Sequence, residues 1–170
     1  KQLVVESILY WCNECKVPLY EQVCGCCGKK GKKFVKDSRI VFPEEKVLLE
    51  ILLGKEQGEL DNVSVWNGNG NIYYADGKNM KLKISELIKQ DTENIRTLYN
   101  ERVQHINTDF FEQMVKRFIT ANKKRFDDID DDAMVQIKKK VKDYDDREIF
   151  VSFSGGKDST VVADLVKRAM

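Results

Sequence analysis

Two Cys-x-x-Cys pairs near the start constrain the fold of this 170-residue chain more than any other feature. All five cysteines lie between residues 12 and 27, and Cys12, Cys15, Cys24 and Cys27 form the two pairs, with eight residues between them. Such a loop holds two thiolates about one tetrahedral edge apart, and two loops complete a Zn²⁺ site. The spacing predicts a compact zinc ribbon, in which four thiolates leave no open position for catalysis.

Two alternatives to a structural zinc site stay open: free or oxidised thiols, and an iron–sulfur cluster. Cys26 is a fifth thiol inside the second pair, where it is either a spectator or a competitor for the metal.

Residues Lys1–Leu9 lack the layout of a secretory signal peptide. No apolar run is long enough to span a membrane. We therefore expect a cytoplasmic protein without a membrane partner, in a compartment where disulfides are rare.

The charge balance excludes two broad classes of protein. Lys and Arg number 29, Asp and Glu number 28, and the net charge is +1. A uniformly basic nucleic-acid coat and an acidic disordered chain are both incompatible with these numbers. The basic excess is local, because residues 1–40 hold 8 basic and 4 acidic residues, whereas residues 41–91 hold 6 and 9.

A run of lysines follows the second cysteine pair, and it has two interpretations. Its members are Lys29, Lys30, Lys32, Lys33 and Lys36, and the first four are the candidate nucleic-acid contacts. The first interpretation is a solvated loop that contributes only solubility. The second is contact with a nucleic-acid phosphate backbone beside the ribbon. The sequence leaves both open.

The region after the ribbon alternates helix and strand signals. The predicted elements are a helix over 44–53, strands over 63–66, 72–75 and 80–84, and a short helix over 86–90. The turn-forming residues Asn67–Asn71 and Asp76-Gly77 separate the strands, which predicts a β-meander. We expect Trp66 to pack inside it, since an exposed tryptophan would instead favour base stacking.

Residues 92–142 are predicted to be helical. Apolar residues at helical spacing form one core-facing stripe, whose members are Phe110, Phe111, Met114, Val115, Phe118 and Ile119. A second helix is expected over 133–141. Asp127–Asp132 is expected to be a solvated loop between the helices, because it lacks the glycine and terminal glutamate of a calcium loop. His105, the one histidine, is expected at the surface or in inter-helix packing.

The segment Ser152-Phe-Ser-Gly-Gly-Lys-Asp-Ser159 follows the apolar run 149–153 and precedes an amphipathic helical pattern. The apolar run predicts a strand buried on both faces, as in a parallel sheet. Two glycines allow close backbone approach, and a helix N-terminus favours an anion. The candidate phosphate-binding residues are Ser152, Ser154, Gly155, Gly156, Lys157, Asp158 and Ser159.

This string resembles the PP-loop, SGGxDS, of the ATP-pyrophosphatase (adenine nucleotide alpha hydrolase-like) superfamily. Residues 149–162 are most similar to the phosphoadenosine phosphosulfate (PAPS) reductase family. The resemblance implies an enzyme that acts on an adenine nucleotide, ATP or an adenylyl-sulfate, in sulfur transfer or reduction. It also implies Mg²⁺ in the full-length enzyme, with Lys157 and Asp158 as catalytic residues.

The resemblance extends upstream. Some PAPS reductase-like proteins carry a zinc ribbon and a small β-rich domain of the PUA type, which residues 10–28 and 40–90 resemble. PUA-type domains often bind RNA, so the resemblance implies an RNA partner. The alternative function is therefore a nucleic-acid-binding module that delivers RNA or DNA to a PP-loop modification enzyme. A third reading is a packing platform for another domain or subunit.

Together these patterns predict an α+β multidomain chain. Its expected parts are a zinc ribbon over 1–39, a PUA-like module over 40–91, a helical connector over 92–147, and the start of a Rossmann-like α/β PP-loop domain over 148–170. A nucleotide-binding parallel sheet needs more strands than one. We therefore expect the N-terminal part of a longer enzyme, inactive alone, whose strand 149–153 is poorly ordered or packs on a second subunit of a homo-oligomer.

Overall fold

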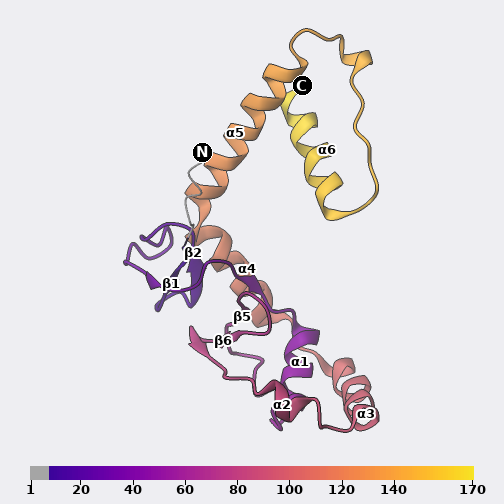
Figure 1. The fold of residues 1–170 in the computed structure, drawn as a ribbon. Coiled ribbons are helices and arrows are strands. Elements are labelled where there is room, and N and C mark those ends of the chain that lie inside the picture. The colour runs from indigo at the N-terminus through magenta and orange to yellow at the C-terminus, as the bar shows by residue number, and fades with distance from the viewer. Residues whose placement is uncertain (1–7) are drawn as a thin grey trace. The chain divides into compact units, whose positions relative to one another are not determined.

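The computed structural model describes residues 8–170 and has the predicted α+β character (Figure 1). The described residues form six α-helices and two small antiparallel sheets. They divide into two compact units, the first ending at Asn122 and the second spanning Lys123–Met170. None of the described helices combines the length and apolar character that crossing a bilayer requires. The sequence analysis found no signal-peptide pattern in Lys1–Leu9. Residues 1–7 of this segment lie outside the described residues.

The first sheet belongs to the cysteine-rich region. Its strands are β1 (Tyr10–Cys12), β2 (Val17–Leu19) and β3 (Lys32–Lys33), in the order β2-β1-β3. Lys16 has a φ of 56°, which lets the chain turn tightly so that Val17 pairs with Cys12. The Cys12–Cys15 pair therefore lies at the turn of the first hairpin.

The second sheet contains the predicted meander. Its strands are β4 (Arg39–Ile40), β5 (Val65–Asn67), β6 (Tyr73–Ala75) and β7 (Lys78–Asn79), in that order. The strand predicted over 80–84 is wrong. Asp76 and Gly77 have φ values of 48° and 79° and form a two-residue turn, so the pairing strand starts at Lys78. The following short helix, α2, spans Ile84–Leu87 rather than 86–90.

Helix α1 (Pro43–Leu52) packs against this sheet and confirms the predicted helix. Its buried Leu49 forms a small core with Val41, Leu60 and Val65. Two charged residues of α1 are also buried, Lys46 and Glu50. Burial of charge is costly unless hydrogen bonds compensate it, so both must be satisfied locally.

The loop after α1 supplies those hydrogen bonds. The Lys46 ammonium donates to the carbonyl oxygens of Leu60 at 3.1 Å and Val63 at 2.8 Å. The Glu50 carboxylate accepts the amides of Gly58 at 3.1 Å and Leu60 at 2.6 Å. The two side chains therefore satisfy backbone groups that would otherwise be unpaired in the interior. Desolvation lowers the pKa of Lys46 to about 8.

Two longer helices complete the first unit. Asp91 caps α3 (Thr92–Arg102), and the 3₁₀ turn η1 (Val103–His105) follows it, with His105 exposed. In α4 (Asp109–Ala121) most of the predicted apolar stripe faces the core, because Met114 is buried and Phe110 and Phe118 pack on the ribbon core. Ile119, also predicted to face the core, is 50% exposed.

The second unit is a helical pair. Helices α5 (Lys123–Val141) and α6 (Lys157–Ala169) lie side by side (Figure 1), and the turn η2 (Asp146–Glu148) lies in their connection. Arg168 of α6 binds both carboxylate oxygens of Asp130, at 2.6 and 2.7 Å. The loop predicted over Asp127–Asp132 is wrong, since these residues lie inside α5. Ion pairs one helical turn apart, such as Lys123–Asp127 at 2.6 Å, support the acidic stretch as helix.

The strand predicted over 149–153 is not formed. The segment is extended, but its five residues have no backbone hydrogen bond to any described residue. It borders an apolar hollow of about 480 Å³, lined in part by Val151, Val162 and Val166. A strand requires a hydrogen-bonded neighbour, and none of the described residues supplies one here. The helix predicted after the glycine loop is confirmed as α6.

Candidate metal centre

The four paired cysteines converge on one point. Their sulfur atoms all lie within 4.8 Å of one another. The Sγ atoms of Cys12 and Cys27 are 3.5 Å apart, and those of Cys15 and Cys24 are 3.7 Å apart. A tetrahedral Zn²⁺ ion with Zn–S bonds of about 2.3 Å requires sulfur separations of about 3.8 Å. The residues present therefore fit a four-thiolate metal site.

Tight turns position each pair. In the first, the Cys15 amide donates to Cys12 Sγ at 3.4 Å, and the Lys16 amide donates to the Cys12 carbonyl at 2.8 Å. In the second, the Gly28 amide donates to the Cys24 carbonyl at 2.8 Å. Gly28 has a φ of 70°, which other residues rarely adopt. The backbone therefore holds the sulfur atoms together.

The thiols differ in burial. Cys12, Cys15 and Cys24 are buried, whereas Cys26 and Cys27 are exposed. Burial raises the pKa of the Cys12 and Cys15 thiols, and the backbone amide of Lys29 lowers the pKa of Cys27. Cys26 lies outside the cluster of sulfur atoms. The geometry therefore makes Cys26 a neighbour of the site and not a fourth or fifth ligand.

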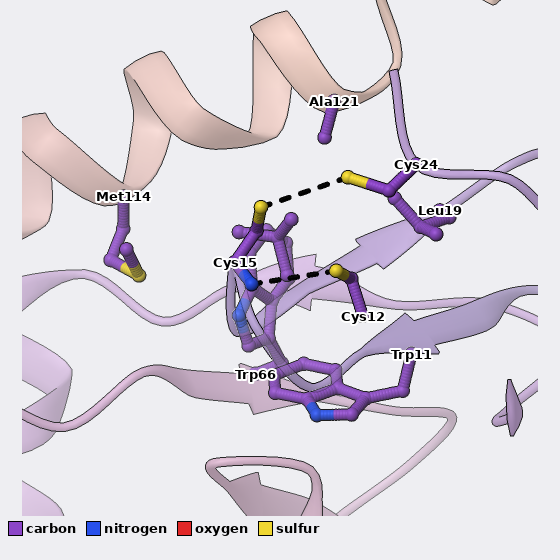
Figure 2. Packing of buried hydrophobic residues seen from close by; sticks show 9 residues of the cluster. Trp11, Cys12, Cys15, Leu19, Cys24, Trp66, Met114 and Ala121 are labelled. Atoms are coloured by element: carbon purple, nitrogen blue, oxygen red, sulfur yellow. Dashed lines mark hydrogen bonds between the residues drawn. The ribbon is translucent and has the colours of Figure 1, made fainter. Parts of the chain in front are cut away.

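The cluster is part of a hydrophobic core that reaches beyond the ribbon. Figure 2 shows the Cys15 and Cys24 sulfur atoms facing each other, with Trp11, Trp66 and Met114 nearby. Trp66 is 1% exposed, and its indole N–H donates to the Ser64 hydroxyl at 2.8 Å. The expectation that Trp66 packs inside the protein is confirmed, and its ring has no face free for base stacking.

Residues at the C-terminal end of α4 form hydrogen bonds with the ribbon, and the sequence analysis did not identify them. The Asn122 side chain accepts the Tyr20 amide at 2.8 Å and donates to the Pro18 carbonyl at 2.9 Å. The Gly25 amide donates to the Ala121 carbonyl at 2.9 Å. Asn122 is 4% exposed. A single asparagine after an apolar helix is an ordinary helix end, so no sequence signal marked this contact.

The lysine run lies at the surface. Lys29 forms an ion pair with Glu14 at 2.6 Å. Lys30, Lys32 and Lys33 are exposed and make no ion pair with any described residue. Lys32 and Lys33 form β3, at the edge of the ribbon sheet. Three lysine ammonium groups near this edge are therefore exposed to solvent and to any anionic partner.

The glycine loop in the second unit has a different character. The Ser154 and Ser159 hydroxyls lie 3.2 Å apart, and Ser154 Oγ accepts the Gly156 amide at 3.4 Å. Gly155 has a φ of 76°, and a Cβ built there meets no atom within 4 Å. The loop therefore turns sharply into α6 with open space beside it.

The first turn of α6 faces outward. The amides of Lys157, Asp158 and Ser159 have no backbone acceptor among the described residues, as expected at a helix N-terminus. Lys157 and Asp158 are exposed and form an ion pair with each other at 2.6 Å. Ser152 lies in the extended segment and makes no hydrogen bond to the loop. The structure thus brings Ser154–Ser159 together and leaves Ser152 apart.

No protein-family model, no curated protein and no solved structure matches this chain. The two sites must therefore be interpreted from their own geometry and from the motifs that carry them.

Proposed function

We propose that Cys12, Cys15, Cys24 and Cys27 bind one structural Zn²⁺ ion. The observation that carries this is the convergence of four sulfur atoms within 4.8 Å, at separations that suit tetrahedral coordination. Three of the four ligands are buried, and thiolates fill every coordination position, so the ion would stabilise the fold and not act on a substrate. Metal analysis of protein purified without added zinc should give about one Zn²⁺ per chain.

We further propose that the glycine loop binds the phosphates of an adenine nucleotide, as the PP-loop resemblance implies. Support comes from the open space beside Gly155 and from the unpaired amides in the first turn of α6. Successive amides at a helix N-terminus attract anions. The proposed parent activity is that of a PAPS reductase-like PP-loop enzyme acting on ATP or an adenylyl-sulfate nucleotide in sulfur chemistry.

Each polar residue of the loop has a proposed role. The Lys157 ammonium would balance negative charge on a phosphate, and the Ser154 and Ser159 hydroxyls would donate hydrogen bonds. The Asp158 carboxylate would help to hold Mg²⁺, the ion that accompanies nucleotide phosphates. Before binding, the ion pair between Lys157 and Asp158 has to open, and both side chains are exposed enough to do so.

The test uses pyrophosphate as a probe of the phosphate site. Titration of the 170-residue chain should shift the amide NMR signals of Gly155, Gly156 and Lys157. Lys157→Ala should weaken the affinity by about tenfold or more. The matched control is Lys138→Ala, which removes a lysine from α5 and should leave the affinity unchanged. If both variants weaken binding equally, the loop is not the site.

A second candidate function is nucleic-acid binding by the ribbon. The observation that favours it is the set of exposed, unpaired cations Lys30, Lys32 and Lys33 at the sheet edge. Three phosphate contacts predict a log–log dependence of affinity on salt with a slope of about −2 to −3. Replacing the three lysines by alanine should flatten this slope without unfolding the ribbon. If the chain does not bind tRNA-sized RNA at low salt, the ribbon is a packing platform.

A further inference from the structure

The two halves of the metal centre each contact the last turn of helix α4. The first half is the Cys12–Cys15 pair with its following strand β2, and that strand ends where Asn122 accepts the Tyr20 amide at 2.8 Å. The second half is the Cys24–Cys27 pair, whose Gly25 amide donates to the Ala121 carbonyl at 2.9 Å. The same end of one helix is therefore hydrogen-bonded from both sides of the cluster.

The contacts between the ribbon and the helix end leave no room for a larger residue at position 25. A Cβ on Gly25 would lie 3.0 Å from the Ala121 oxygen and 3.1 Å from the Thr120 oxygen, so a larger residue would push the second pair away from the helix. Asn122 is buried and also donates to the Phe118 carbonyl at 2.9 Å, so one side chain joins the helix end to β2. Buried hydrogen bonds of this kind hold one arrangement, because leaving either partner unpaired is costly.

We infer that metal binding at the four cysteines fixes the C-terminal end of α4, and that Asn122 and Gly25 carry this coupling. A metal ion joins the two cysteine pairs, and only when they are joined are β2 and Gly25 held in register with the helix end. Asn122 is the last residue of the first unit. The metal thus orders the last residue of the first unit.

The coupling must act in both directions. If metal binding orders the helix end, then weakening the contacts of the helix end must weaken metal binding by the same factor. If the helix merely lay near the cysteines, changing its end would leave the zinc affinity unchanged. The inference rests on the zinc site proposed above.

The experiment compares two variants of the same helix. Asn122→Ala removes the contacts at the C-terminal end, whereas Asn107→Ala removes the exposed side chain that accepts the Asp109 amide at 2.9 Å at the N-terminal end. Zinc affinity is measured on the full chain by competition with a chromophoric chelator. We expect about tenfold weaker affinity for Asn122→Ala and a change of less than about twofold for Asn107→Ala, the matched control.

Hydrogen exchange provides the second readout. Zinc should slow exchange of the Tyr20 and Asn122 amides in the wild type, and much less in Asn122→Ala. Equal zinc affinity in wild type and Asn122→Ala would overturn the coupling while leaving the zinc site intact. Failure of the wild type to bind zinc would overturn the proposed site itself.

If Asn122→Ala does not fold, a second variant replaces it. Asn122→Asp keeps the acceptor for the Tyr20 amide and should give an intermediate loss of zinc affinity. An unchanged zinc affinity in Asn122→Asp would also overturn the coupling.

Discussion

The cysteine cluster and the glycine loop are the two chemical motifs of this chain, and the structure supports them in opposite ways. The cysteines lie in a core shared by the ribbon, β5 and α4, which includes Trp11, Trp66 and Met114. The loop Ser154–Ser159 lies at the surface, and no residue of the second unit whose burial the structure describes is buried. Segment 149–153 before it has no strand partner among the described residues.

The difference shows what each motif requires from its surroundings. A four-thiolate site needs only two short turns and a small core, and the described residues provide both. A phosphate loop between a strand and a helix needs a sheet that holds the strand, and the second unit provides only helices beside it. The described residues therefore bring all four paired cysteines together, whereas the glycine loop has no paired strand before it among them.

The largest effect should follow loss of a metal ligand. Cys12→Ser should abolish stoichiometric zinc binding and unfold the ribbon, because metal binding and folding of such small sites are coupled. Cys26→Ser is the matched control, since Cys26 lies outside the sulfur cluster, and it should retain both zinc and the fold. Metal analysis and circular dichroism measure the two effects. Zinc retained in Cys12→Ser would mean that Cys26 substitutes as a ligand or that the assignment of Cys12 is wrong.

The second-largest effect is on stability, and it is tested by removing one aromatic side chain from each unit. Trp66→Ala removes a side chain that is 1% exposed and packs against Phe118 with ring centroids 5.1 Å apart, so it should cost about 3–5 kcal/mol of unfolding free energy. Phe150→Ala removes a side chain that is 88% exposed and should cost less than about 0.5 kcal/mol. Denaturant titration measures both. Comparable costs would mean that 149–153 is packed as well as the ribbon core.

The sequence predicted which four cysteines cluster, because the paired spacing is typical of a metal site. It also predicted α1, α4 and α6, since their apolar periodicity is strong. It misplaced the strand at 80–84, because the two-residue Asp76-Gly77 turn makes β7 start at Lys78, two residues before the predicted strand. The acidic stretch Asp127–Asp132 was predicted as a loop but is helical, and Asp127, Asp128 and Asp130 form ion pairs with Lys123, Lys124 and Arg168.

Other features depend on tertiary contacts that no local pattern carries. Asn122 and Gly25 act through partners about a hundred residues away in the chain, so the sequence could not predict the contact between the ribbon and the end of α4. Lys46 and Glu50 look like ordinary surface residues of a helix, and only the path of the loop after α1 buries them. The PP-loop assignment stays a prediction, because the structure contains the loop and α6 without a paired strand.

The smallest effect is a pH dependence in the first unit. Because burial lowers the pKa of Lys46 to about 8, the unfolded chain binds more protons than the folded chain between that value and the ordinary lysine pKa of 10.5. The contribution of Lys46 to stability should therefore rise as the pH increases through this range. Lys46→Met keeps the packing of the stem and cannot titrate. The stability of the wild type relative to Lys46→Met should increase from about pH 7 to about pH 10, and a constant difference would contradict the burial of the ammonium.

The most direct test of the four-cysteine site is a count of reactive thiols against bound metal. In the native protein one zinc ion should shield Cys12, Cys15, Cys24 and Cys27, so a thiol reagent should find one accessible thiol per chain, that of the exposed Cys26. After denaturation with a chelator, all five thiols should react, and one zinc ion should be released per chain. Five thiols reacting in the native protein, with no zinc released, would contradict the account.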